Sequence, residues 1–191
     1  MNEITVEQYG DWEEMAAPHA WAISLNAADL RTRWRRCSLS ADFCARYAAL
    51  SVPPAAPPPR LSRRDAESVF AYLLNELFEN AAKFSNGAQT AVQYRAWMRP
   101  DDVVFQMTNH IRPEGQRPFV ALIQELLEND PDELYFQKLE ENAEQDTDGS
   151  GLGYLTLIKD YGVHFGFRFR HLDENNMAVD VQARVSLEEE I

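Results

Sequence analysis

The apolar positions of this chain repeat with two different periods, which separate predicted helices from predicted strands. Between residues 62 and 86, large apolar side chains recur every three or four positions, the spacing of one helix face packed on a core. Alternation over residues 89–98 and an apolar run over 103–108 predict two strands, and residues 163–170 and 177–187 predict a late hairpin. The core-facing stripe of the long helix is predicted to be Ala66, Phe70, Leu73, Leu74, Leu77, Ala81 and Phe84.

The first sixty residues show a different organisation from the rest of the chain. Two short strands, at residues 4–9 and 20–25, are followed by one or two helices over 30–50. The segment SVPPAAPPPR, residues 51–60, then interrupts the pattern, because repeated proline excludes helix and central strand. We therefore predict an N-terminal accessory segment at residues 1–60 and a core at residues 61–191.

A polar triad borders the apolar stripe of the long helix. Within NELFENAAKFS, the side chains of Glu76, Asn80 and Lys83 lie just beside the stripe and are half shielded from water. Such a border suits a metal, a phosphate or a proton acceptor. The alternative is an ordinary amphipathic helix whose polar residues are merely solvated.

A glycine loop comes about seventy residues later. In GSGLGYLTLIKDYG, glycines at 149, 151 and 153 lead into an apolar segment of helical spacing. Glycine lets backbone N–H groups approach an anion, and a following helix N-terminus adds its dipole, so the pattern predicts a phosphate cradle. It is not a P-loop, since no Lys-Ser or Lys-Thr follows, and the acidic residues before it disfavour a dinucleotide fingerprint. A plain turn is the alternative.

Taken together, the two motifs resemble those of the GHKL group of Bergerat-fold ATPases, which includes histidine kinases and anti-sigma serine kinases. The helix matches E-x-x-x-N-A-x-K with Glu76, Asn80, Ala81 and Lys83, and the loop matches GxGLG from Gly149 to Gly153. The resemblance covers about residues 62–187. The segments RTRWRRCSLSADFCARY, LLNELFENAAKFS and DPDELYFQKLEENAE look more closely like the SiaB-type bacterial regulators, small stand-alone members of that group.

The resemblance implies a fold, a cofactor and a role for each motif residue. The expected fold is an α/β two-layer sandwich, with a mixed sheet covered on one face by helices. ATP and Mg²⁺ are the expected ligands, with Glu76 as general base, Asn80 as the metal ligand and Lys83 against the phosphates. The loop residues expected to hold the phosphates are Gly149, Ser150, Gly151, Leu152 and Gly153. About forty residues, 112–148, stand where the family has its ATP lid; they are predicted to form helices at 117–128 and 131–144, with Asp130-Pro131 as N-cap and N1 pair of the second helix.

The sequence departs from the family pattern where the adenine base is expected to bind. The family's D-x-G-x-G box is replaced here by residues 109–114, so that Asn109 stands in the place of the aspartate. Asn109 still accepts a hydrogen bond through its carbonyl oxygen, although without the charge of a carboxylate.

Two functions stay open. The chain is either a serine/threonine kinase acting on an anti-anti-sigma-like protein partner, or a non-catalytic module that binds and sequesters such a partner.

Charge and composition exclude several of the remaining classes of function. The net charge of −13 comes entirely from the second half of the chain, since residues 1–100 carry equal numbers of acidic and basic side chains, and nucleic-acid binding is not expected. No apolar run is long enough to span a bilayer and no signal peptide is recognisable, so a cytoplasmic protein without membrane attachment is expected.

Arg31, Arg33, Arg35 and Arg36 form a cluster that is either an anionic-partner site or, more simply, a solvated helix face. Cys37 and Cys44 are expected to be apolar fillers rather than a disulfide. A homodimer is left open.

Overall fold

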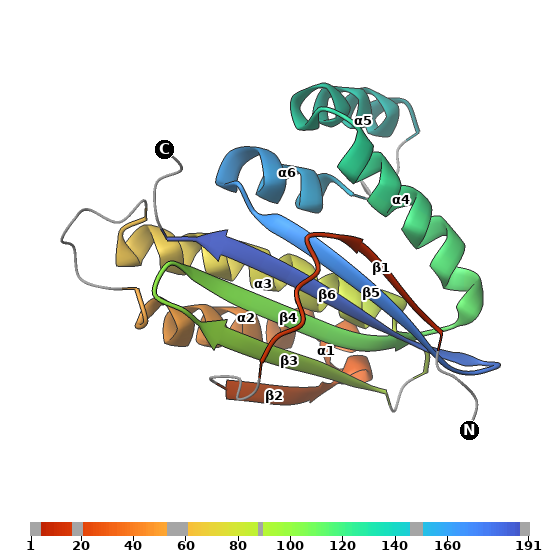
Figure 1. Cartoon of the computed structure of the whole chain (residues 1–191), viewed down its shortest axis with the longest axis horizontal. Coiled ribbons are helices and arrows are strands. Elements are labelled where there is room, and N and C mark those ends of the chain that lie inside the picture. Colours follow the sequence, from red (N-terminus) through yellow and green to blue (C-terminus); the bar gives the residue numbers. More distant parts are fainter. Residues whose placement is uncertain (1–4, 17–20, 53–60, 88–89, 146–150, 188–191) are drawn as a thin grey trace.

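The computed structural model describes residues 5–16, 21–52, 61–87, 90–145 and 151–187, which form a two-layer α/β sandwich (Figure 1). One layer is a six-stranded sheet in the order β1-β5-β6-β4-β3-β2. Helices cover one face of this sheet, so the predicted fold class is confirmed. The strands are β1 (Val6–Gly10), β2 (Trp21–Asn26), β3 (Ala91–Met98), β4 (Asp102–Ile111), β5 (His164–Asp173) and β6 (Asn176–Ser186).

The prediction of a mixed sheet is wrong, because every ladder between these strands is antiparallel. Short turns join β3 to β4 and β5 to β6 as hairpins, and a hairpin can only pair antiparallel strands. The two edge strands also run against their neighbours. The parallel pairing that a mixed sheet requires is therefore not found among the described strands.

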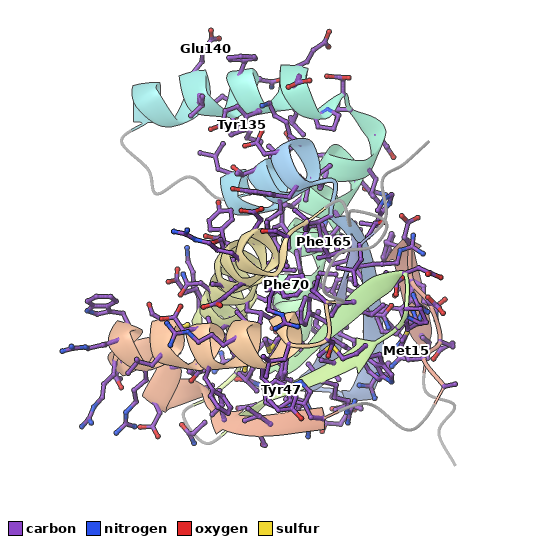
Figure 2. All side chains as sticks on the ribbon, turned by 90° about the vertical axis from the view of Figure 1, so that its left-hand side faces the viewer. Met15, Tyr47, Phe70, Tyr135, Glu140 and Phe165 are labelled. Carbon is purple, nitrogen blue, oxygen red and sulfur yellow. The ribbon has the colours of Figure 1, made fainter. Side chains whose placement is uncertain are left out.

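Helix α3 (Arg63–Phe84) is the centre of the helical layer. Its N-cap is Ser62, whose Oγ accepts a hydrogen bond from the backbone N–H of Asp65 at 3.2 Å. The predicted stripe is buried, except that Phe84 is 56% exposed, because this last helical residue extends beyond the core. Three residues outside the stripe are also buried: Val69, Phe78 and Ala82. Helix α2 packs against α3, and the ring centroid of Phe78 lies 5.9 Å from that of Tyr94 in β3. Figure 2 shows Phe70 and Phe165 in the core between the helices and the sheet.

The N-terminal segment is built into this sandwich. Strand β1 pairs with β5 and strand β2 with β3, so the two strands form opposite edges of one sheet. Helices α1 (Ala27–Thr32) and α2 (Trp34–Ala49) then pack against α3. Cys37 and Cys44 are free thiols buried in α2, and burial raises the pKa of each to about 12, which confirms their role as apolar fillers. The division of the chain at residue 60 stays a prediction.

The insertion after β4 has the predicted helices. A short 3₁₀ turn, η1 (Pro113–Gly115), precedes α4 (Gln116–Glu128), which is followed by α5 (Pro131–Gln145) and α6 (Leu152–Tyr161). The Asp130 carboxylate accepts hydrogen bonds from the backbone N–H groups of Asp132 and Glu133 at 3.0 and 3.1 Å, so it is the N-cap of α5 as predicted. Within the described ranges, no helix has the length and apolar character needed to cross a membrane.

The second face of the sheet is polar and is crossed by the segment that follows β1 (Figure 1). The backbone N–H of Glu13 donates to Gln182 Oε1 at 3.1 Å, and Gln182 Nε2 donates back to the carbonyl of Glu13 at 2.9 Å. Gly166 is required beneath this segment, because a Cβ there would lie 2.6 Å from the backbone of Trp12. The N-terminal segment is therefore fastened across the polar face.

Asp180 is the centre of that polar face and has no exposed surface. Its carboxylate accepts hydrogen bonds from Thr108 Oγ1 at 2.6 Å, Arg168 Nε at 3.0 Å and Arg170 Nε at 2.9 Å. A buried charge with this many donors is compensated by its surroundings.

Candidate functional site

The last turns of α3 carry the predicted triad on the side facing α6. Glu76 and Asn80 are half-buried, whereas Lys83 is exposed. The Nζ of Lys83 lies 5.5 Å from the ring centroid of Phe84. The three side chains line a single cavity, as the sequence spacing predicts.

Glu76 is held in contact with the glycine loop. A Cβ at position 153 would overlap the Glu76 carboxylate and lie 2.6 Å from its Cδ, so only glycine leaves room for this side chain. Burial raises the pKa of Glu76, and the negative charge of Glu79 raises it further. A carboxylate whose proton affinity is raised in this way is suited to accept a proton from a substrate hydroxyl.

Asn80 is positioned by Tyr154 from the first turn of α6. The two side chains share a hydrogen bond, and Tyr154 is buried against Phe165 with ring centroids 5.0 Å apart. Burial raises the pKa of Tyr154, and its interaction with Asn80 opposes that rise.

This arrangement fits Mg²⁺ only if a bound phosphate completes the coordination shell. Asn80 offers one hard oxygen and Glu76 a nearby carboxylate, the ligand types that Mg²⁺ prefers. Within the described ranges, no group of three His, Cys, Asp or Glu side chains converges to hold a metal. A cation here would therefore take its other ligands from phosphate and water.

The described part of the glycine loop leads into α6 through a left-handed residue, and its predicted role as a phosphate cradle stays a prediction. Gly151 has a φ of +95° and is the N-cap of α6, so the first N–H groups of this helix lack partners within it. Gly151 and Gly153 line the cavity, whereas Leu152 does not. Gly149 and Ser150 lie outside the described residues, and their predicted role is untested.

Asn109 lies deep in the cavity rather than after the end of a strand. Strand β4 continues to Ile111, because β6 pairs with it over its full length and Asn109 lies opposite Val179. The side chain is 5% exposed, and its Nδ2 donates to Ser85 Oγ at 3.4 Å. Ser85 Oγ in turn donates to the backbone carbonyl of Ala81 at 2.6 Å.

The cavity has a volume of about 990 Å³ and brings together Glu76, Asn80, Lys83, Asn109, Gly151 and Gly153. Buried apolar side chains, among them Met107, Val179 and Val181, also line it. This volume is at the upper end of the range for small-molecule sites, about 300 to 1,000 Å³, and is large enough for a nucleotide.

Two arginines and a tyrosine are among the contributors to the cavity that were not predicted. Arg31, from α1, and Arg112, just after β4, add cations to its lining, and Arg112 Nε donates to Asn86 Oδ1 at 3.1 Å. Tyr154 supports Asn80. Arg31 is separated from the triad by about 45 residues along the chain, so only tertiary packing of α1 on α3 places it here. The sequence signal was the arginine cluster, which had no predicted link to the triad.

Comparisons with known proteins leave the family of this chain open. No protein-family model matches the sequence, and no curated protein matches it. Among solved structures, the crystal structure of the SiaB-SiaC complex from Pseudomonas aeruginosa contains a chain that is 14% identical, with a TM-score of 0.49. That match covers 86% of this chain and 89% of the other. The likeness is too weak to assign a family, so the GHKL resemblance stays a prediction.

Proposed function

We propose that this chain is a cytoplasmic signalling regulator that binds ATP with Mg²⁺ and phosphorylates a serine or threonine of a protein partner. The observation that carries the proposal is the shared cavity. A half-buried carboxylate of raised pKa, an amide oxygen and a left-handed glycine before a helix N-terminus line one cavity of about 990 Å³. Phosphoryl transfer depends mainly on positioning and charge stabilisation, and these groups supply both.

In the proposed reaction, Glu76 accepts the proton of the incoming hydroxyl. The hydroxyl oxygen then forms a bond to the γ-phosphorus, the bond from that phosphorus to the β,γ-bridging oxygen breaks, and ADP leaves. Lys83, Arg31 and Arg112 offset the negative charge at the cavity. Mg²⁺, when bound, would neutralise phosphate charge, and Asn80 is the residue that would hold it.

Asn109 favours a second function, that of a non-catalytic module that sequesters its partner. The family's aspartate accepts a hydrogen bond from adenine, whereas the Asn109 amide already donates to Ser85 and carries no charge. A weaker contact with adenine is consistent with a chain that binds no nucleotide, or that binds one only to support its fold. The two functions differ in whether phosphate reaches the partner.

The test is Glu76→Gln, which keeps the shape of the side chain and removes its basic oxygen. The partner is captured by pull-down, with the products of neighbouring genes as first candidates, and transfer is followed with labelled ATP and intact-mass analysis. We expect the variant to keep ATP and partner binding and to lose about 10²- to 10⁴-fold in transfer rate. Glu67→Gln is the matched control, because Glu67 lies on the same helix outside the cavity, paired with Arg46.

Wild-type protein that binds ATP and its partner but never transfers phosphate would exclude the kinase and leave the non-catalytic module. Equal transfer by wild type and Glu76→Gln would instead remove Glu76 from the reaction.

A further inference from the structure

Helix α1 brings an arginine of the N-terminal segment to the cavity. Arg31, in the last turn of this helix, lines the cavity together with Glu76 and Lys83. The GHKL resemblance begins only at the long helix α3, so the motifs of that group do not account for Arg31. Its place at the cavity comes from the packing of α1 on α3 in the helical layer (Figure 1).

Contacts between α2 and α3 locate α1 along the cavity. Arg46 binds Glu67 at 3.0 Å, and Ser38 Oγ donates a hydrogen bond to Asn75 Oδ1 at 3.4 Å. Moving back along α2 therefore moves forward along α3, so the two helices are antiparallel. Helix α1 precedes α2, and it consequently lies beside the C-terminal end of α3, the end that carries Lys83.

Helix α1 is held firmly in this place. The Asn26 side chain caps it by accepting hydrogen bonds from two backbone N–H groups of its first turn, at 2.9 and 3.2 Å. The backbone N–H of Ala27 donates to the carbonyl of Thr90 at 2.9 Å, and Leu30 is buried. The next residue, Arg31, has an exposed side chain, so a fixed backbone presents its guanidinium at the cavity.

The cavity is cationic, although the chain as a whole is acidic. Five side chains that are charged at neutral pH line it: Arg31, Lys83, Arg112, Glu76 and Glu79. Cations therefore outnumber acids in the lining, whereas the net charge of the chain is −13. A concave site whose sign opposes that of the whole protein attracts and holds an anion.

Within the described residues, Arg31 forms no ion pair. The acid of its own helix, Asp29, binds Arg36 at 2.8 Å. Glu79, which lines the same cavity, accepts a hydrogen bond from Asn75 Nδ2 at 2.7 Å. The Arg31 guanidinium, a planar fork of N–H donors that matches phosphate oxygens, is therefore left for a ligand.

The proposed nucleotide would place its phosphates within reach of this fork. Its base lies by Asn109, which is 5% exposed, so the phosphate chain extends from there toward the exposed side chains of the cavity. We propose that Arg31 binds the terminal phosphate of ATP, beside Lys83, and that the N-terminal segment thereby distinguishes ATP from ADP. This inference rests on the proposed function, because it requires a nucleotide in the cavity.

Calorimetric titration of the full-length chain with ATP and with ADP, each with Mg²⁺, tests the inference. We expect Arg31→Ala to lower the affinity for ATP by about 10-fold, the scale of one hydrogen bond to a charged group, and to leave the affinity for ADP within about twofold of wild type. Arg31→Lys keeps the charge without the planar fork, so it should recover part of the lost affinity.

Arg35→Ala is the matched control. Arg35 is exposed on α2 outside the cavity lining, and its removal changes the net charge of the chain by the same amount. This variant should bind both nucleotides like the wild type. Thermal unfolding without nucleotide should give the wild-type midpoint for each variant, because the substituted side chains are exposed.

Three outcomes would overturn the inference, and they are distinguishable. If Arg31→Ala binds ATP like the wild type, Arg31 is not part of the site, and the proposed function stands without it. If the variant loses affinity for ATP and ADP equally, Arg31 attracts anions in general and does not read the terminal phosphate. A wild-type chain that binds neither nucleotide overturns the proposed function, and the inference with it.

Discussion

Two shielded carboxylates lie on opposite faces of the sheet, and their surroundings differ. Asp180 is fully buried and accepts hydrogen bonds from Thr108, Arg168 and Arg170. Glu76 is half-buried beside another acid, and within the part of the chain that the structure describes its carboxylate has no hydrogen-bond or ion-pair partner. Asp180 is thus compensated and holds the polar face together, whereas Glu76 is left with a raised proton affinity at a cavity. The surroundings of Asp180 satisfy its carboxylate, whereas Glu76 is the carboxylate that we propose takes part in chemistry.

The largest effect should come from neutralising the compensated acid. Asp180→Asn leaves Arg168 and Arg170 without their carboxylate, and removing one partner of a buried pair costs about 3 to 5 kcal/mol of unfolding free energy. Urea unfolding measures the loss. Glu174→Gln, in the exposed turn between β5 and β6, is the control and should have little effect. If the loss of unfolding free energy is only as small as that from breaking a surface ion pair, Asp180 is not the centre of the polar face.

Moving the Glu76 side chain without substituting it should lower activity but not stability. In Gly153→Ala the new methyl group overlaps the Glu76 carboxylate and moves it. We expect phosphate transfer to fall by up to about 10²-fold, the scale of an ångström-sized misplacement. Unfolding free energy should stay level or rise, since alanine is a better helix residue by up to about 1 kcal/mol. Transfer at the wild-type rate would show that the contact between Gly153 and Glu76 has no catalytic consequence.

Asn109→Asp should make the stability of the folded chain depend on which nucleotide is bound. The new carboxylate is buried and faces Ser85 Oγ, which already donates to Ala81, so it lacks the donor that it needs. We expect a loss of about 1 to 3 kcal/mol without nucleotide, much of it recovered on adding ATP, whose amino group supplies a donor, but not on adding GTP. Thermal unfolding with each nucleotide measures this. If ATP and GTP recover stability equally, the base is recognised elsewhere.

The smallest effect concerns pH. Because the pKa of Glu76 is raised in the folded state, the ionised carboxylate costs stability above that folded pKa, and the cost vanishes below the ordinary value of 4.5. The advantage in unfolding free energy of Glu76→Gln over wild type should therefore grow as pH rises from 4.5 to the folded pKa and then level off. Unfolding curves of both proteins over this range measure it. A constant difference would mean that the pKa of Glu76 is not raised.

Much of the fold could be predicted because local signals and packing agree. The cap at Asp130 and the apolar period of α3 each mark an element that the structure confirms. Phe84 was assigned wrongly to the core, because periodicity does not show where the partner of a helix face ends. The direction of the strands was also wrong, since apolar patterns do not distinguish parallel from antiparallel pairing.

The candidate site was predictable only where its residues lie on one element or in one loop. Glu76 and Asn80 follow from helical spacing, and Gly151 and Gly153 follow from a local motif. Arg31 and Tyr154 reach the cavity through the packing of α1 and α6 against α3, which no single segment encodes. The extension of β4 past Thr108 depends on its long partner β6, and it is this pairing that holds Asn109 in the sheet.

The most direct test of the central claim is calorimetric titration of the full chain with ATP, with and without Mg²⁺. We expect one ATP per chain with Mg²⁺ and much weaker binding without it. Asn80→Ala should lose about 10- to 100-fold in affinity, the scale seen when the support of a metal site is disturbed. Asn75→Ala is the control, because Asn75 lies on the same helix outside the cavity lining, bonded to Glu79. Equal affinity in wild type and Asn80→Ala, or no binding by either, would contradict the account.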